Sequence, residues 1–213
     1  VDINVEDMIV NIPEDRNILV TRMISRIMSK QKMHFVANYG LDFKILYSFL
    51  KNLGMDCFIE QNYIVINSYN NDFKEIMEVN SGFYPKICSD WQPIIAVLLL
   101  NYCKEFIITD EVFESRYEYM RQLESFLNGF EYVYDDKKLQ VKIKNPITVK
   151  EQGNRNFECL DIRASATLFL ALNNWEVADF TVSNLDQFLR GYSSISDFSR
   201  EFETRCKYVF DEQ

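Results

Sequence analysis

Apolar and polar positions along the chain alternate between helix-like and strand-like runs. In residues 12–68 the apolar spacing predicts a helix, a short strand, a second helix and a hairpin, at 13–28, 34–38, 41–53, 57–60 and 63–67. Gly54 directly follows the second helical pattern, in the position that favours a helix C-cap. These runs form one βαβαββ-like unit.

Two further stretches, residues 84–145 and 158–211, repeat this order of elements. The second predicts an apolar helix, a strand, a helix and a hairpin, at 89–100, 105–109, 116–127 and 131–143. Gly129 comes after the second helical pattern of this unit, in the C-cap position that Gly54 has in the first unit. Asp135-Asp136 marks the turn of the hairpin. The third predicts a helix, a strand, a helix and a last strand, at 161–172, 176–182, 193–204 and 207–210. The fold class is therefore α/β (α+β), in one domain spanning 1–213.

An acid begins the first helix of each unit. Asp90 follows Asp15 by 75 positions, and Asp161 follows Asp90 by 71. An aspartate at a helix start can cap the free backbone N–H groups there, and Arg163 can be the ion-pair neighbour of Asp161. Because the spacing is regular, three helix N-termini are expected on one side of the domain, which is a place suited to an anionic ligand.

Composition and charge narrow the class of protein. The 213 residues carry a net charge of -9, with no basic run interleaved with aromatic residues, so nucleic acid is excluded as a partner. The longest apolar stretch, 93–100, is too short for a membrane span, and the polar N-terminus has no signal-peptide pattern. We expect a soluble, cytoplasmic protein with no membrane partner.

The residues that usually hold metals or cofactors are sparse. The chain has 5 cysteines without a C-x-x-C pair, so we expect free, buried thiols at 57, 88, 103, 159 and 206. A zinc site or a Ser-His-Asp triad would have to use the single histidine, His34, which sits in an apolar run and favours a strand. The 6 glycines form no phosphate-binding loop. The sequence predicts no metal and no cofactor.

Four short motifs carry a family resemblance. SDWQ at 89–92, EVFESRY at 111–117, LDIRASATL at 160–168 and LRGY at 189–192 occur in the order and approximate spacing found in the UDP-N-acetylglucosamine 1-carboxyvinyltransferases. The chain resembles this branch of the enolpyruvyl transferase family from about Pro13 onward. The resemblance implies an inside-out α/β barrel of three βαβαββ repeats, as in EPSP synthase. It also implies a transferase that moves the enolpyruvyl group of phosphoenolpyruvate to the 3-hydroxyl of UDP-N-acetylglucosamine in peptidoglycan synthesis.

The same resemblance implies roles for particular residues. Asp90 matches the acid that accepts the proton of the sugar 3-hydroxyl, a role that a carboxylate within hydrogen-bond reach can fill. Arg116 and Arg190 match arginines that hold the carboxylate and phosphate of phosphoenolpyruvate, for which the planar guanidinium is suited. Val112 matches a residue whose backbone contacts the acetamido group, and Asp161 and Arg163 match a pair that shapes the closed cleft.

The residues by themselves leave plainer alternatives open. Arg116 can be a solvated helix residue, and Arg190 can serve only the loop before Ser193. Gln187-Phe188-Leu189 separates Asp186 from Arg190, where the family has the acid and the arginine adjacent.

The family's other domain, with its reactive loop and uridine contacts, has no counterpart in the sequence. We expect about half an active site, completed by a second domain or covered by self-association. The start without Met indicates a fragment or an engineered domain. The alternative function is a non-catalytic binding or regulatory domain on the same scaffold.

Overall fold

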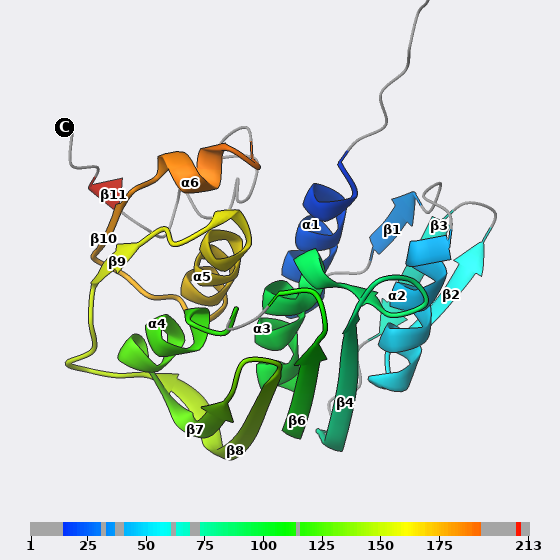
Figure 1. The fold of residues 1–213 in the computed structure, drawn as a ribbon, viewed down its shortest axis with the longest axis horizontal. Helices are drawn as coiled ribbons and strands as arrows, with labels where there is room; N and C mark the ends of the chain where they lie inside the picture. The colour runs from blue at the N-terminus through cyan, green and yellow to red at the C-terminus, as the bar shows by residue number, and fades with distance from the viewer. Residues whose placement is uncertain are drawn as a thin grey trace, which may run out of the picture.

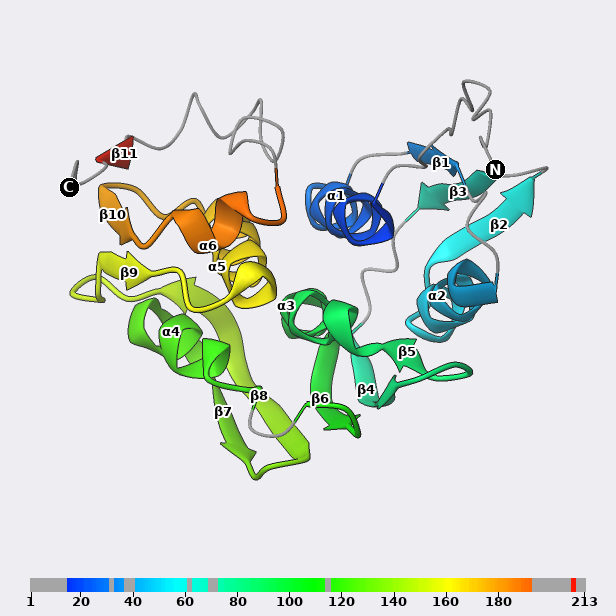
Figure 2. The same cartoon turned by 45° about the horizontal axis from the view of Figure 1, so that its top comes forward.

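Three helices lie side by side at the centre of the molecule. The computed structural model describes residues 15–30, 33–36, 41–60, 63–68, 73–113, 116–192 and 208–209. Helices α1 (Arg16–Met28), α3 (Gln92–Tyr102) and α5 (Ile162–Asn174) pack against one another (Figures 1 and 2). Every residue of α3 except Asn101 is buried, as expected for a helix that is apolar on all sides.

Three sheets surround these helices (Figure 2). The first has the order β1-β3-β2 and is antiparallel, from β1 (Met33–Val36), β2 (Asp56–Glu60) and β3 (Tyr63–Ser68). The second has the order β5-β4-β6-β8-β7, from β4 (Lys74–Gly82), β5 (Ile87–Cys88), β6 (Cys103–Asp110), β7 (Leu127–Tyr134) and β8 (Lys138–Val149). The third has the order β11-β10-β9 and is parallel, from β9 (Asn156–Glu158), β10 (Phe180–Ser183) and β11 (Tyr208–Val209). The described strands do not close into one barrel.

The remaining helices connect these layers: α2 (Leu41–Asn52), the 3-10 turn η1 (Ser89–Trp91), α4 (Tyr119–Phe126) and α6 (Asp186–Leu189). The mixed α/β fold class is confirmed. The predicted helix at 193–204 lies outside the described residues. No helix within the described ranges combines the length and the apolar character that a membrane span requires.

Strand β4 is a central strand that the apolar pattern did not predict. It pairs parallel with β6, and α3 forms the crossover between the two. Its exposed positions include Glu75, Ile76 and Glu78, whereas Met77 and Val79 are buried in the core. Charged residues on both faces, Lys74 and Glu78 on one and Glu75 on the other, conceal the strand because they break the alternation of apolar and polar positions.

The two glycines that were predicted to end helices differ in their roles. Gly54 has φ 90° and follows α2, and the Met55 N–H donates to the Leu50 carbonyl, so this C-cap is confirmed. The prediction for Gly129 is wrong, because α4 ends at Phe126 and Gly129 lies in β7 with φ 102°. A Cβ there would lie 2.7 Å from the carbonyl oxygen of Pro146, so the β7–β8 pairing itself requires glycine.

Candidate functional site

The acids at the three helix starts have two different roles. Asp15 Oδ1 accepts the Asn17 N–H at 2.6 Å and caps α1, and Asp161 Oδ1 accepts the N–H groups of Arg163 and Ala164 at 2.7 and 2.9 Å and caps α5. Asp90 lies in η1, before α3, and its side chain caps no helix N–H. Its carboxylate is turned toward arginines instead.

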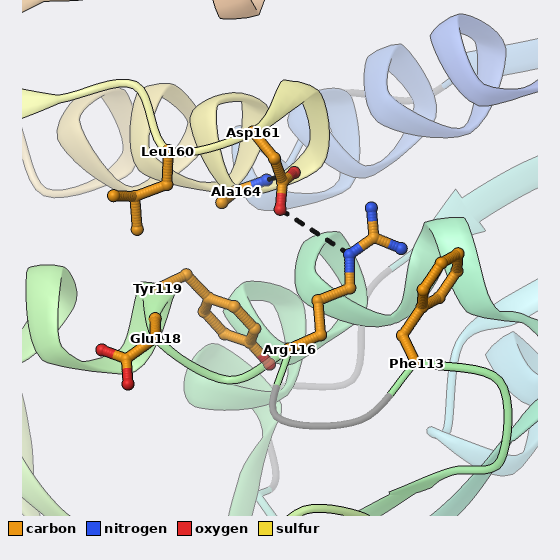
Figure 3. A pocket seen from close by; sticks show the side chains of 7 residues that line it. All are labelled: Phe113, Arg116, Glu118, Tyr119, Leu160, Asp161 and Ala164. Atoms are coloured by element: carbon orange, nitrogen blue, oxygen red, sulfur yellow. Dashed lines mark hydrogen bonds and ion pairs between the residues drawn. The ribbon is translucent and has the colours of Figure 1, made fainter.

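Asp90, Arg116, Asp161 and Arg163 meet in one set of ion pairs, which we call the arginine–aspartate cluster. Asp90 Oδ1 lies 3.4 Å from Arg116 Nη1, and its Oδ2 lies 3.4 Å from Arg163 Nη2. Arg116 Nε lies 3.7 Å from Asp161 Oδ2 (Figure 3). The cluster joins residues from η1, the turn before α4 and the start of α5, and its formal charges cancel.

The two arginines of the cluster are more deeply buried than its two aspartates. The side chain of Arg163 is 10 % exposed and that of Arg116 is 18 % exposed, whereas those of Asp90 and Asp161 are 34 % and 43 % exposed. A guanidinium out of water is costly unless it is paired, so the two carboxylates stabilise the deeper arginines. Arg163 Nη1 is buried and has no hydrogen-bond partner in the described part of the chain.

An open pocket of about 420 Å³ adjoins the cluster (Figure 3). It is lined by Phe113, Arg116, Glu118, Tyr119, Leu160, Asp161 and Ala164. The Arg116 guanidinium lies over the Phe113 ring at 4.3 Å, which holds the cation beside the opening. A pocket of this size with an apolar rim and a few charged groups suits a small polar ligand.

Tyr119, which lines the pocket, forms a buried polar pair with Gln92. The Gln92 side-chain amide donates to the Tyr119 hydroxyl at 2.5 Å, and both side chains are almost fully buried. Burial raises the pKa of Tyr119 well above its usual value, so the phenol stays protonated at neutral pH. The pair joins the start of α3 to the start of α4 and has no acid–base role near neutrality.

Two residues that the resemblance assigned to the site do not join the cluster. The Arg190 guanidinium is exposed and donates to Gln187 Oε1 at 3.0 Å, because α6 fills the inserted segment and turns it aside. The Val112 N–H donates to Asp110 Oδ1 at 2.9 Å, so that backbone donor is already occupied.

Several residues of the site were not singled out in the sequence: Ser81, Ser89, Gln92, Asp110, Phe113, Glu118, Tyr119, Leu160 and Ala164. Asp110 is the clearest, because an acid that directly ends the apolar run FIIT is a recognisable signal of a buried or functional carboxylate. Phe113 and Leu160 lie within the motifs EVFESRY and LDIRASATL, and both are 42 % exposed. A large apolar side chain left in water beside a pocket is a signal that only the structure supplies.

The structure places four of the cysteines and the single histidine. Cys57, Cys103 and Cys159 are buried free thiols, Cys88 is partly buried, and Cys206 lies outside the described residues. His34 lies in β1 opposite Val65, as the strand prediction requires. In the described ranges no three His, Cys, Asp or Glu side chains converge to hold a metal ion.

Comparison with known proteins gave three informative matches. No family model matches the chain. It is 24% identical over 148 residues to UDP-N-acetylglucosamine 1-carboxyvinyltransferase of Kosmotoga olearia, covering 70% of this chain and 33% of that protein. It is 29% identical over 136 residues to the protein of the same name from Buchnera aphidicola, covering 62% and 30%.

The structural comparison supports the same relationship at the level of fold. The crystal structure of the enolpyruvyl transferase NikO from Streptomyces tendae superposes with a TM-score of 0.63 at 19% identity, over 84% of this chain and 41% of that one. The chain spans about a third of the length of the two curated relatives.

Proposed function

We propose that the chain belongs to the enolpyruvyl transferase family and is a domain of an enzyme that transfers the enolpyruvyl group of phosphoenolpyruvate to the 3-hydroxyl of UDP-N-acetylglucosamine. This reaction would supply a precursor of peptidoglycan in the cytoplasm, where both substrates occur. The observation that carries the proposal is the convergence of Asp90, Arg116, Asp161 and Arg163 beside one pocket.

Asp90 is the proposed proton acceptor. Its contacts with the two guanidinium groups, at 3.4 Å, are longer than the ~2.7–2.9 Å of tight ion-pair hydrogen bonds, so a substrate hydroxyl can replace one of them. The hydroxyl oxygen then bonds to the phosphoenolpyruvate carbon that bears the phosphate ester, its proton passes to Asp90, and the methylene carbon takes up a proton from solvent as the double bond becomes a single bond. Phosphate then leaves, the methyl group loses a proton to restore the double bond, and Asp90 returns its proton to solvent. The net change replaces the phosphate ester with an ether.

Arg116 is the proposed electrostatic partner of phosphoenolpyruvate, and Arg163 is proposed to support Asp90. Arg116 borders the pocket and retains some solvent exposure, so it can contact a carboxylate or phosphate oxygen there. Arg163 lies deeper and holds Asp90 from the other side. Asp161 fixes the orientation of Arg116 through its Nε while it caps α5.

The proposed active site is completed by a second domain, because the chain spans about a third of its curated relatives. That domain can act in trans, or a second copy of this chain can cover the open side. Central helices α1, α3 and α5 inside three sheets, together with the repeat of 75 and 71 positions, support an inside-out barrel of three units.

The test measures phosphate release that depends on both phosphoenolpyruvate and UDP-N-acetylglucosamine, for the full chain alone and with the second enolpyruvyl-transferase domain of the same genome. Asp90→Asn should lower the rate by about 10²-fold or more, since it removes the base. Asp15→Asn is the matched control, because it changes the acid at a different helix start and keeps the cap. No release in either mixture, or equal rates for the two variants, would contradict the proposal.

The second candidate function is a non-catalytic binding or regulatory domain. The outward orientation of Arg190 favours it, because an anion clamp of this family would then lack one arginine. This candidate expects binding of phosphoenolpyruvate to the folded chain without phosphate release in any combination. Calorimetric titration of the full chain with phosphoenolpyruvate, beside the release assay, separates it from the first.

A further inference from the structure

The most deeply buried carboxylate beside the site belongs to Asp110. It ends β6, is 1 % exposed, and does not line the pocket. Its Oδ1 accepts the Ser89 hydroxyl at 3.0 Å and the N–H groups of Val112 and Phe113 at 2.9 and 3.2 Å, and its Oδ2 accepts the Ser81 hydroxyl at 3.2 Å. A carboxylate is tolerated out of water when donors satisfy its lone pairs, and four donors do so here.

These donors lie on the two segments that carry the cluster. Ser89 directly precedes Asp90 in η1. Phe113 stands three positions before Arg116, and its ring lies beneath the guanidinium of Arg116 at 4.3 Å. Asp110 therefore contacts both the segment that carries Asp90 and the segment that leads to Arg116.

We infer that Asp110 is a positioning residue that holds Asp90 and Arg116 in register through its bonds to Ser89 and to the backbone at 112–113. This inference rests on the proposed function for its consequence in catalysis, but the register itself is a property of the folded chain. Ser81 comes from β4, which carries no member of the cluster, and its hydroxyl lies 3.4 Å from that of Ser89, so Ser81 reaches the cluster only indirectly, through Asp110 and Ser89.

Ser81 and Ser89 form a matched pair for the test, because both hydroxyls are buried and both donate to Asp110. Ser89→Ala and Ser81→Ala in the full chain should each lower the melting temperature by a similar few degrees. The side-chain Nε–H signal of Arg116 in an NMR spectrum reports the cluster. Its hydrogen-exchange rate should rise about five- to tenfold in Ser89→Ala, and stay within about twofold of the parent rate in Ser81→Ala.

The Asp110→Asn variant provides a second, independent test of the inference. Asparagine keeps the volume but presents an NH₂ group in place of one oxygen, so it cannot accept all four donors. It should raise the Arg116 exchange rate at least as much as Ser89→Ala does. If Ser89→Ala does not fold cooperatively, Ser89→Cys, which keeps the volume and a weaker donor, replaces it.

Equal exchange rates in the two serine variants, or no change in either, overturn the inference. The NMR readout needs no turnover, so a failure of the phosphate-release assay contradicts the proposed function and leaves this test standing. Where turnover is found, Ser89→Ala should lower kcat more than Ser81→Ala, with the two variants equal in melting temperature.

Discussion

Asp90 Oδ2 lies 3.4 Å from Nη2 of Arg163, although 73 positions separate the two residues in the chain. The contact joins the turn before α3 to the first turn of α5. Arg163 is the more buried partner, with 10 % of its side chain exposed against 34 % for Asp90. The pair therefore stabilises a buried cation and orients an accessible carboxylate at the same time.

The first prediction is an energetic coupling between Asp90 and Arg163. In a double-mutant cycle of Asp90→Asn and Arg163→Met, urea unfolding should give a coupling of about 0.5–1.5 kcal/mol, limited by the solvent exposure of Asp90. The exposed pair Lys104–Glu75 is the control and should show less than about 0.5 kcal/mol. Equal coupling in the two pairs would show that burial of Arg163 does not strengthen its contact.

A second prediction separates the two roles of Asp161. Asp161→Asn keeps the cap on α5 but removes the charge beside Arg116, so the free energy of unfolding should fall by only about 0.5 kcal/mol. Asp161→Ala removes both and should cost about 1–2 kcal/mol. Both values come from chemical denaturation. An asparagine variant as unstable as the alanine variant would assign the stabilisation to the ion pair.

The local elements were predictable from sequence because their signals are local. Asp15 and Asp161 precede helices, and Gly54 follows one, so their chemistry and their place agree. The prediction for Gly129 failed because the need for glycine there comes from β8, a different segment, and β4 was concealed by charged residues on both of its faces. A glycine that serves a cross-strand contact looks like a helix cap in sequence.

The sequence predicted which residues form the arginine–aspartate cluster of the candidate site, but it did not predict their contacts. The motif resemblance named Asp90, Arg116, Asp161 and Arg163, and the structure brings these four together. Their contacts depend on how α3 and α5 pack, which no single motif encodes. Arg190 differs because the four-residue helix α6 occupies the inserted segment and sets the direction of its side chain.

The third prediction concerns Gly191 of the LRGY motif, which packs on the first turn of α5. A Cβ at this position would lie 2.2 Å from Cγ2 of Ile162, so Gly191→Ala should destabilise the fold by about 1–3 kcal/mol. Ile162→Leu removes the β-branch, and the double variant should recover most of the lost melting temperature. A stable single variant, or a double variant with no recovery, would contradict the close packing.

The last prediction is a loss of stability at alkaline pH that Cys103 contributes to. Cys103 lies at the junction of α3 and β6, and burial raises the pKa of its thiol from 9.0 to about 12, opposed by Lys74. The folded chain keeps this proton above pH 9 while the unfolded chain releases it, so the stabilisation is complete below pH 9 and is lost as pH rises toward 12. Between pH 8 and pH 10 the free energy of unfolding should fall by about 1 kcal/mol more in the parent than in Cys103→Ala. Each protein is compared with itself at the two pH values, so the cavity left by alanine cancels. Identical falls in the two proteins would show that the Cys103 thiol does not stay protonated in the folded chain.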